Sequence, residues 1–190
     1  MDFKGSQTEK NLLAAFAGES QARNRYTFFA SIAKKEGYEQ IGGIFEETAG
    51  NEKEHAELFF NHLKGGIAEI TASYPAGIKG STVDNLKAAA AGEKLEWGKL
   101  YPNFGDIAQQ EGFLEVAATF RMVARVEAYH ERRYNKLVES MEQSKVFKKD
   151  QPIKWKCRNC GFVFEGKEAP ENCPVCAHPK AFFEAWVENY

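Results

Sequence analysis

The sequence lacks both the long apolar segment of a membrane protein and the one-sided charge of a nucleic-acid binder. No run approaches the roughly 20 apolar residues that a membrane-spanning helix needs, and residues 1–6 lack the apolar core of a signal peptide. The 25 Lys and Arg residues nearly balance the 27 Asp and Glu residues, whereas nucleic-acid binding requires a basic excess or stripe. We therefore expect a cytoplasmic protein that binds neither a membrane nor nucleic acid.

Cysteine is absent from the first 156 residues, and all four cysteines lie between Cys157 and Cys176. In a chain without an export signal, this clustering indicates a metal site rather than disulfides. The composition, with 43% hydrophobic and 27% charged residues over 190 positions, is that of a globular chain long enough for a medium domain plus a small one. We expect a helical domain at residues 1–150 and a small domain at residues 151–190.

Four segments before the cysteines have the apolar periodicity of amphipathic helices. Two of them lie within residues 6–64. A third is expected to end at Pro102 and Gly105, and the fourth to run from about Ile107 to Met141. Four such helices predict a mainly α protein built on a four-helix bundle.

The connections between these helices specify the topology of the bundle. Short links within the first pair and within the second pair favour antiparallel neighbours. The Gly-rich connection at residues 65–80 is long enough to run the length of a bundle, because extended chain spans about 3.3 Å per residue. Two antiparallel pairs joined by one long crossover predict a ferritin-like bundle. The tail has about 40 residues, and chains shorter than that rarely fold without a metal, disulfides or a partner.

Charged residues occupy positions on the apolar stripes where core residues are expected. Every helix has a carboxylate there, and two helices add a His three residues later on the same face. These residues are Glu19, Glu52, His55, Glu93, Glu127 and His130. Buried carboxylates are costly without compensating charge, and Arg23 or Arg25 would neutralise one carboxylate but not four.

The arrangement of these residues repeats in the two halves of the chain. Glu52 follows Glu19 by 33 residues, and Glu127 follows Glu93 by 34. One Glu-x-x-His pair alone is common on exposed helices, but a Glu from each of two helices plus Glu-x-x-His from two others is the ligand set of di-iron carboxylate bundles. We therefore predict two divalent cations in the bundle, and the oxygen and imidazole ligands favour Fe or Mn over copper.

Three further residues at the same level of the bundle are candidates for the metal site. Glu96 lies three residues after Glu93 and is either a fifth ligand or a solvated residue beside Trp97. Tyr26 and Tyr101 are either core residues or phenols that hydrogen-bond a ligating carboxylate.

The tail has two Cys-x2-Cys motifs with twelve residues between them, formed by Cys157, Cys160, Cys173 and Cys176. This spacing is strong evidence for a tetrahedral site of four thiolates, and both zinc and iron fit it. The same spacing occurs in a structural zinc ribbon, so a non-enzymatic interaction protein remains an alternative.

Residues 16–26, 52–55, 92–96 and 125–130 resemble the rubrerythrin family, and residues 157–161 and 173–176 resemble its rubredoxin-like domain. The resemblance covers essentially the whole chain, in the domain order of the family. One departure is Ala177 after the fourth cysteine, where rubredoxins often have Gly.

The resemblance implies a non-haem iron peroxidase that reduces hydrogen peroxide to water and protects against oxidative stress. It implies two irons in the bundle and one in the tail, where zinc can substitute for iron. It also implies that a reductase or a rubredoxin donates electrons to the rubredoxin-like iron, which passes them to the di-iron site, as in NADH peroxidases. It also implies a head-to-tail homodimer. The family's di-iron ligands correspond to Glu19, Glu52, His55, Glu93, Glu96, Glu127 and His130, and its tyrosines beside the site to Tyr26 and Tyr101.

The resemblance further implies that one iron exchanges Glu96 for His55 on reduction. The alternative function is a ferroxidase or iron-handling protein that uses oxygen. The same carboxylates and imidazoles serve that reaction, but it gives no reason for the attached tail.

Overall fold

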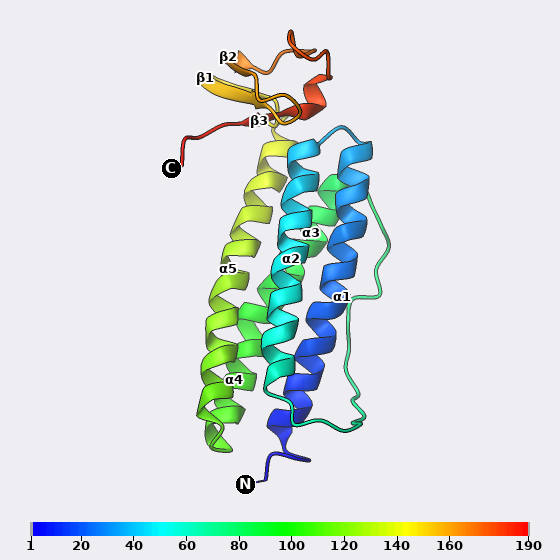
Figure 1. Ribbon diagram of the computed structural model, residues 1–190, viewed down its shortest axis with the longest axis vertical. Helices are drawn as coiled ribbons and strands as arrows, with labels where there is room; N and C mark the ends of the chain where they lie inside the picture. Colours follow the sequence, from blue (N-terminus) through cyan, green and yellow to red (C-terminus); the bar gives the residue numbers. More distant parts are fainter. Residues whose placement is uncertain (1, 190) are drawn as a thin grey trace.

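Figure 1 shows the computed structural model of the chain, a long helical bundle with a small sheet at one end. The structure describes residues 2–189. The helical elements are α1 (Gln7–Lys35), α2 (Glu39–Asn61), α3 (Thr82–Leu95), a π-helical turn (Glu96–Leu100), α4 (Tyr101–Gln110) and α5 (Leu114–Glu142). The predicted mainly α, ferritin-like bundle with a small cysteine-bearing sheet is therefore confirmed.

Local sequence explains where the helices begin. The Ser6 hydroxyl accepts a hydrogen bond from the backbone N–H of Glu9 and thereby caps α1. At α3, Ser81 and Asp84 form a reciprocal capping box. Gly37, with φ 86°, makes the tight turn from α1 into α2. This turn reverses the chain, and α1 and α2 lie as antiparallel neighbours along the bundle (Figure 1).

The predicted end of the third helix is wrong. Pro102 and Gly105 lie inside α4, so the helical column begun by α3 continues to Gln110. The π-helical turn explains this, because the Tyr101 N–H donates to the Glu96 carbonyl five residues earlier and Pro102 can then begin a fresh α-helix. The turn into the last helix occurs instead at Gly112, with φ 90°, so α5 starts at Leu114 rather than near Ile107.

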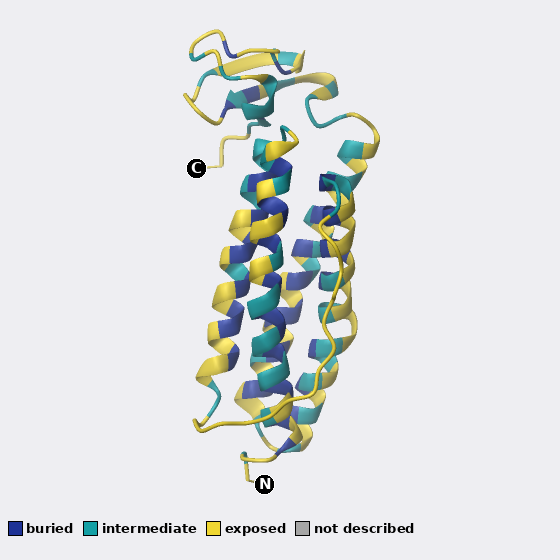
Figure 2. Ribbon diagram, turned by 90° about the vertical axis from the view of Figure 1, so that its right-hand side faces the viewer, coloured by how far each residue is buried: buried dark blue, intermediate teal, exposed yellow. Residues whose placement is uncertain are grey.

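The connection between α2 and α3 is the long crossover that the sequence predicts. It runs along the outside of the bundle, and most of its residues are exposed (Figure 2). Tyr74 fastens it to the bundle, because its hydroxyl donates to the Ala14 carbonyl at 2.8 Å.

The apolar core of the bundle consists of two clusters at different heights. The cluster nearer the α1–α2 turn includes Phe29 and Phe45, and the other includes Leu12, Phe59 and Phe120. On each of the long helices, the buried Glu and His residues lie between the two clusters along the chain. The bundle therefore encloses a charged layer between two apolar layers.

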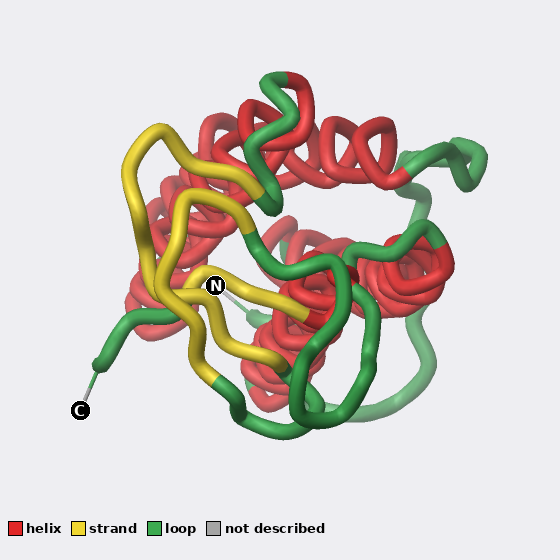
Figure 3. Tube along the Cα trace, turned by 90° about the horizontal axis from the view of Figure 1, so that it is seen from above, coloured by secondary structure: helices red, strands yellow, loops and turns green. Residues whose placement is uncertain are grey.

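The tail folds as a three-stranded antiparallel sheet in the order β2-β1-β3. Its strands are β1 (Lys148–Cys157), β2 (Val163–Glu168) and β3 (Phe183–Ala185). Figure 3 shows the sheet lying over the ends of the helices. Arg158 of the tail approaches Gly43 of α2, where a side chain on the glycine would collide with its guanidinium. Within residues 2–189, no helix has the length and apolarity to span a membrane.

Candidate metal centres

Six of the predicted bundle ligands converge on two overlapping groups in the charged layer. Within each group, one ligand atom from every residue lies within 4.8 Å of the others. The first group is Glu19, Glu52, His55 and Glu127, and the second is Glu52, Glu93, Glu127 and His130. Each group has three carboxylates and one imidazole, and both share Glu52 and Glu127. Glu52 and Glu127 would therefore be available as ligands to both cations.

The contacts of the two histidines are nearly symmetric. His55 Nδ1 lies 2.9 Å from Glu52 Oε2 and 2.8 Å from Glu127 Oε1. His130 Nδ1 lies 2.7 Å from Glu127 Oε2 and 3.3 Å from Glu52 Oε1. Each imidazole therefore faces both shared carboxylates. The i, i+3 spacing on α2 and α5 produces this arrangement, since it aims Glu and His from one helix at the same point.

The donor set fits two divalent cations. All four carboxylates are buried, with at most 1% of each residue exposed. Several of their oxygens have no hydrogen-bond partner in the described structure, namely Glu19 Oε2, Glu52 Oε1, Glu93 Oε2 and both oxygens of Glu127. Buried acceptors without a donor are rare in proteins, and buried anions need compensating charge. A pair of iron ions would satisfy both requirements.

The environment favours protons on this cluster when no cation is bound. Burial, followed by repulsion from Glu52, raises the pKa of Glu19 well above its ordinary value. Burial alone would lower the pKa of His55, but its close contacts with the carboxylates of Glu127 and Glu52 raise it to about 9. Burial likewise lowers the pKa of His130, but its contacts with Glu127 and Glu52 raise it to about 12. Cations and protons therefore compete for one set of ligands.

Metal-free protein is expected to lose stability as the pH rises from 6.5 to about 9. The folded-state pKa of His55 lies above the unfolded value, so its stabilising contribution is complete below pH 6.5 and disappears as the pH passes about 9. The raised pKa of Glu19 acts in the same direction, starting at lower pH. Urea unfolding of chelated protein at several pH values measures this, with iron-loaded protein as the control. Stability that stays constant or rises over this range would contradict the expectation.

Both predicted tyrosines touch the cluster. The Tyr26 hydroxyl donates to Glu93 Oε1 at 2.6 Å, and the Tyr101 hydroxyl donates to Glu19. Both side chains are buried, and burial followed by the nearby carboxylates raises the pKa of each phenol well above its ordinary value. The phenols therefore keep their protons beside the carboxylates that they contact.

Glu96 stands apart from the six converging residues. It belongs to neither group, and it is half-buried where the other four carboxylates are buried. It begins the π-helical turn, a feature that often marks functional sites. Burial and repulsion from Glu93 raise the pKa of Glu96, whereas the positive charge of Arg25 lowers it. Arg25 thus lies beside Glu96, while Arg23 is exposed.

Tyr134 is not among the predicted site residues, yet it borders the site. Its ring packs edge-on against Tyr26 at a centroid distance of 5.7 Å, and its buried hydroxyl has no hydrogen-bond partner within the described residues. Burial and the charge of Glu93 raise its pKa. The sequence could have indicated this position, because Tyr134 follows His130 by one helical turn on the same apolar stripe.

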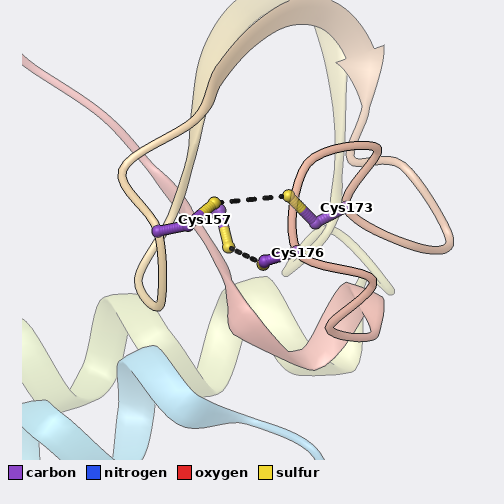
Figure 4. A group of neighbouring side chains, drawn as sticks. Cys157, Cys173 and Cys176 are labelled. Atoms are coloured by element: carbon purple, nitrogen blue, oxygen red, sulfur yellow. Dashed lines mark hydrogen bonds between the residues drawn. The ribbon is translucent and has the colours of Figure 1, made fainter.

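The four cysteines of the tail form a second cluster, and Figure 4 shows Cys157, Cys173 and Cys176 directing their sulfurs toward one another. The Sγ atoms of Cys157 and Cys176 are 3.7 Å apart, and those of Cys160 and Cys173 are 3.6 Å apart. A disulfide would need about 2.0 Å. A tetrahedron with metal–sulfur bonds of about 2.3 Å has edges of about 3.8 Å. The spacing therefore fits one metal ion in four sulfurs.

Two similar turns carry the cysteine pairs. The Gly161 N–H donates to the Cys157 carbonyl at 2.9 Å, and the Ala177 N–H donates to the Cys173 carbonyl at 2.9 Å. Gly161 has φ 81° and Ala177 has φ 59°, so both lie in the left-handed region that favours glycine. Ala177 therefore keeps the turn at some cost in backbone strain. A backbone hydrogen bond from His178 lowers the pKa of Cys176 to about 6, which favours the thiolate.

Comparison with known proteins places both clusters in one family. The rubrerythrin family profile matches residues 10–138 and 84–157, and the profile of the rubredoxin-like domain of rubrerythrin matches residues 155–184. Rubrerythrin of Porphyromonas gingivalis is 63% identical over 187 residues, which cover 98% of this chain and 94% of the relative. Rubrerythrin of Clostridium perfringens is 54% identical over 191 residues, covering 98% of each chain.

Solved structures agree with the sequence relatives. The fully reduced, all-ferrous state of nigerythrin superposes with a TM-score of 0.63 at 33% identity, covering 97% of this chain and 91% of that one. The likeness extends over both the bundle and the tail. The chain therefore belongs to the rubrerythrin family, whose di-iron site and rubredoxin-like iron site correspond to the two clusters described above.

Proposed function

We propose that the chain is a di-iron peroxidase that reduces hydrogen peroxide to water, with electrons relayed through the iron of the four-cysteine site. The presence of both centres on one chain carries the proposal. Peroxide reduction consumes two electrons, and a one-electron iron–sulfur centre attached to the bundle supplies a means of restoring them. Oxygen-dependent iron handling, the alternative, needs only the bundle.

The proposed ligands are the residues of the two clusters. They are Glu19, Glu52, His55, Glu93, Glu96, Glu127 and His130 in the bundle, and Cys157, Cys160, Cys173 and Cys176 in the tail. When bound, the two bundle irons supply both electrons together and polarise the peroxide. We propose that Glu96 and His55 would be alternative ligands of one iron, Glu96 when the iron is oxidised and His55 when it is reduced. Structures of the oxidised and reduced protein with the same ligands at both irons would contradict this exchange.

The chain's own residues hold the protons that the reaction needs. Reduction of one peroxide to two waters takes up two protons, and Tyr26 and Tyr101 each keep one on a buried hydroxyl beside a carboxylate. A phenol or a carboxylic acid at this distance can act as a general acid. Glu96, whose pKa is raised by burial, is a further proton carrier.

The remaining parts of the proposal concern the electron donor, the location, the oligomeric state and the domains of the protein. An electron-donor reductase or a rubredoxin would reduce the tail iron, and the donor would draw on NADH. We also propose a cytoplasmic location, a head-to-tail homodimer, and a division into domains at residues 1–150 and 151–190.

The diferrous protein is expected to react faster with hydrogen peroxide than with oxygen at equal concentrations. The reason is that the two-electron, two-proton reduction of peroxide matches the electrons and protons that the site holds. Stopped-flow mixing of the reduced protein with each oxidant measures the two rates. A faster reaction with oxygen would transfer support to the ferroxidase alternative.

A further inference from the structure

A cavity of about 690 Å³ lies between α1, the column formed by α3 and α4, and the crossover. Residues 69–75 of the crossover form its outer wall, where the segment passes along the outside of the bundle (Figure 2). Tyr74 holds this wall in place through its hydrogen bond to the Ala14 carbonyl and through its ring, which faces Gly18. The cavity is therefore formed by ordered contacts between the crossover and the bundle.

The cavity connects the solvent to the charged layer. At its rim, Ile70 is 38% exposed and Leu95 is 47% exposed. At its inner end, Tyr101 is 2% exposed and donates a hydrogen bond to Glu19. Glu96 also lines the cavity, which accounts for its greater exposure compared with the other four carboxylates. A molecule that enters at the rim therefore reaches the edge of the proposed di-iron site.

The cavity is much larger than hydrogen peroxide requires. One water occupies about 30 Å³ in the liquid, and peroxide has only one more oxygen atom. A volume of about 690 Å³ falls instead in the range of sites for organic ligands. Much of the wall is apolar, with Ala14, Ile70, Leu95, Leu100 and Phe104 facing the space. An apolar group larger than peroxide would be accommodated there.

Polar groups in the wall complement this apolar surface. Arg25 lines the cavity beside Glu96, and its buried Nε atom has no hydrogen-bond partner within the described residues. A buried N–H without an acceptor is costly, so the group is suited to a ligand oxygen. Arg25 and Glu96 together place a hydrogen-bond donor and a carboxyl group in the cavity wall beside the buried cluster.

We propose that the cavity admits organic hydroperoxides and makes them substrates of the same site. The apolar group R lies against the apolar wall, and the hydroperoxide group lies at the end that holds Arg25 and Glu96. The O–O bond of ROOH breaks, and two protons and two electrons, one from each ferrous ion, convert it into ROH and water. This inference rests on the proposed peroxidase function and adds a substrate class to it.

The kinetic test uses a substitution that narrows the cavity. At Gly92, which lines the cavity, an added Cβ would meet only the Arg25 Nη2 atom at 4.0 Å, so the side chain in Gly92→Leu has room to project into the space. The matched control is Gly50→Leu, on an exposed part of α2 where an added Cβ meets nothing within 4 Å. Each reduced protein is mixed with hydrogen peroxide and with cumene hydroperoxide, and the alcohol product is counted per iron pair.

The wild type and Gly50→Leu are expected to form one 2-phenyl-2-propanol per iron pair. Because one methylene group in a pocket changes a rate by about 10- to 200-fold, Gly92→Leu should slow the cumene reaction at least about tenfold more than the peroxide reaction. Equal slowing of both reactions would overturn the inference. A wild-type protein that reacts with hydrogen peroxide but not with cumene hydroperoxide would also overturn the inference, while leaving the proposed peroxidase function intact. A wild type that reacts with neither would contradict the proposed function itself.

A binding measurement tests the cavity without turnover. Zinc-loaded protein is diamagnetic, and NMR titration with 2-phenyl-2-propanol should shift the backbone amides of Ile70, Gly92 and Leu95 but not that of Gly50. Should Gly92→Leu fail to retain metal, Leu95→Trp at the exposed rim serves as the second narrowing variant. Its titration should show weakened binding. Amide shifts that are absent from the cavity, or that survive Leu95→Trp unchanged, would overturn the inference.

Discussion

Glu127→Ala is expected to lose both bundle metals while the four-cysteine site keeps its metal. Glu127 belongs to both ligand groups, and its two oxygens lie 2.8 Å from His55 Nδ1 and 2.7 Å from His130 Nδ1. Its removal therefore takes one ligand from each cation position. Since loss of even an outer partner of a ligand lowers metal affinity by about 10- to 100-fold, loss of a shared ligand should exceed that.

Two further variants make the experiment selective. Glu19 belongs to only one group, so Glu19→Ala leaves the set of Glu52, Glu93, Glu127 and His130 intact and should lose one metal rather than two. Glu139→Ala removes an exposed glutamate from α5, so it controls for the substitution itself. Metal analysis together with the visible absorption of the tail iron counts the ions at each site. Full di-metal occupancy in Glu127→Ala would show that the proposed ligand set is wrong.

The chemistry of the bundle site was predictable because buried charge is a local signal. A glutamate on an apolar helical stripe can be recognised from a single sequence. So can a second Glu-x-x-His pair that follows its partner glutamate by nearly the same number of residues as the first. The sharing of Glu52 and Glu127 was not predictable in the same way. It depends on how far each helix is rotated about its axis, and packing between segments distant in sequence determines that rotation.

The π-helical turn was missed because periodicity analysis assumes 3.6 residues per turn throughout. Pro102 was interpreted as a stop signal, although the apolar pattern continues beyond it at Phe104 and Ala108. A proline within a continuing stripe points to a local change of helix type as well as to an end. The change matters for the site, since the turn begins at Glu96, the one proposed bundle ligand outside both ligand groups.

The tail was predictable in a different sense. Two Cys-x2-Cys motifs fix the cluster without knowledge of the fold, and the observed sulfur separations match one tetrahedral ion. Sequence did not show that the tail would lie on the α1–α2 end of the bundle, with Arg158 against Gly43. That contact depends on surface complementarity between the bundle and the tail, for which no periodic pattern exists.

Zinc in the tail is expected to abolish donor-driven turnover while leaving the fold and the reaction of the bundle unchanged. Zinc and iron both accept four thiolates in a tetrahedron, so the sulfur separations of 3.6 and 3.7 Å suit either ion. Zinc has no redox chemistry, so it cannot pass electrons from a reductase to the bundle.

The measurement compares two ways of delivering electrons to the same zinc-substituted protein. Turnover driven by a rubredoxin reductase should fall to the level measured without the reductase, because the relay is interrupted. Reoxidation of a chemically reduced bundle by hydrogen peroxide should keep its wild-type rate, because the ligands of the two sites are separate residues. Iron returned to the tail provides the control and should restore turnover. Donor-driven turnover that is unchanged with zinc would show that the tail serves structure alone, and the electron-relay part of the proposed function would fail.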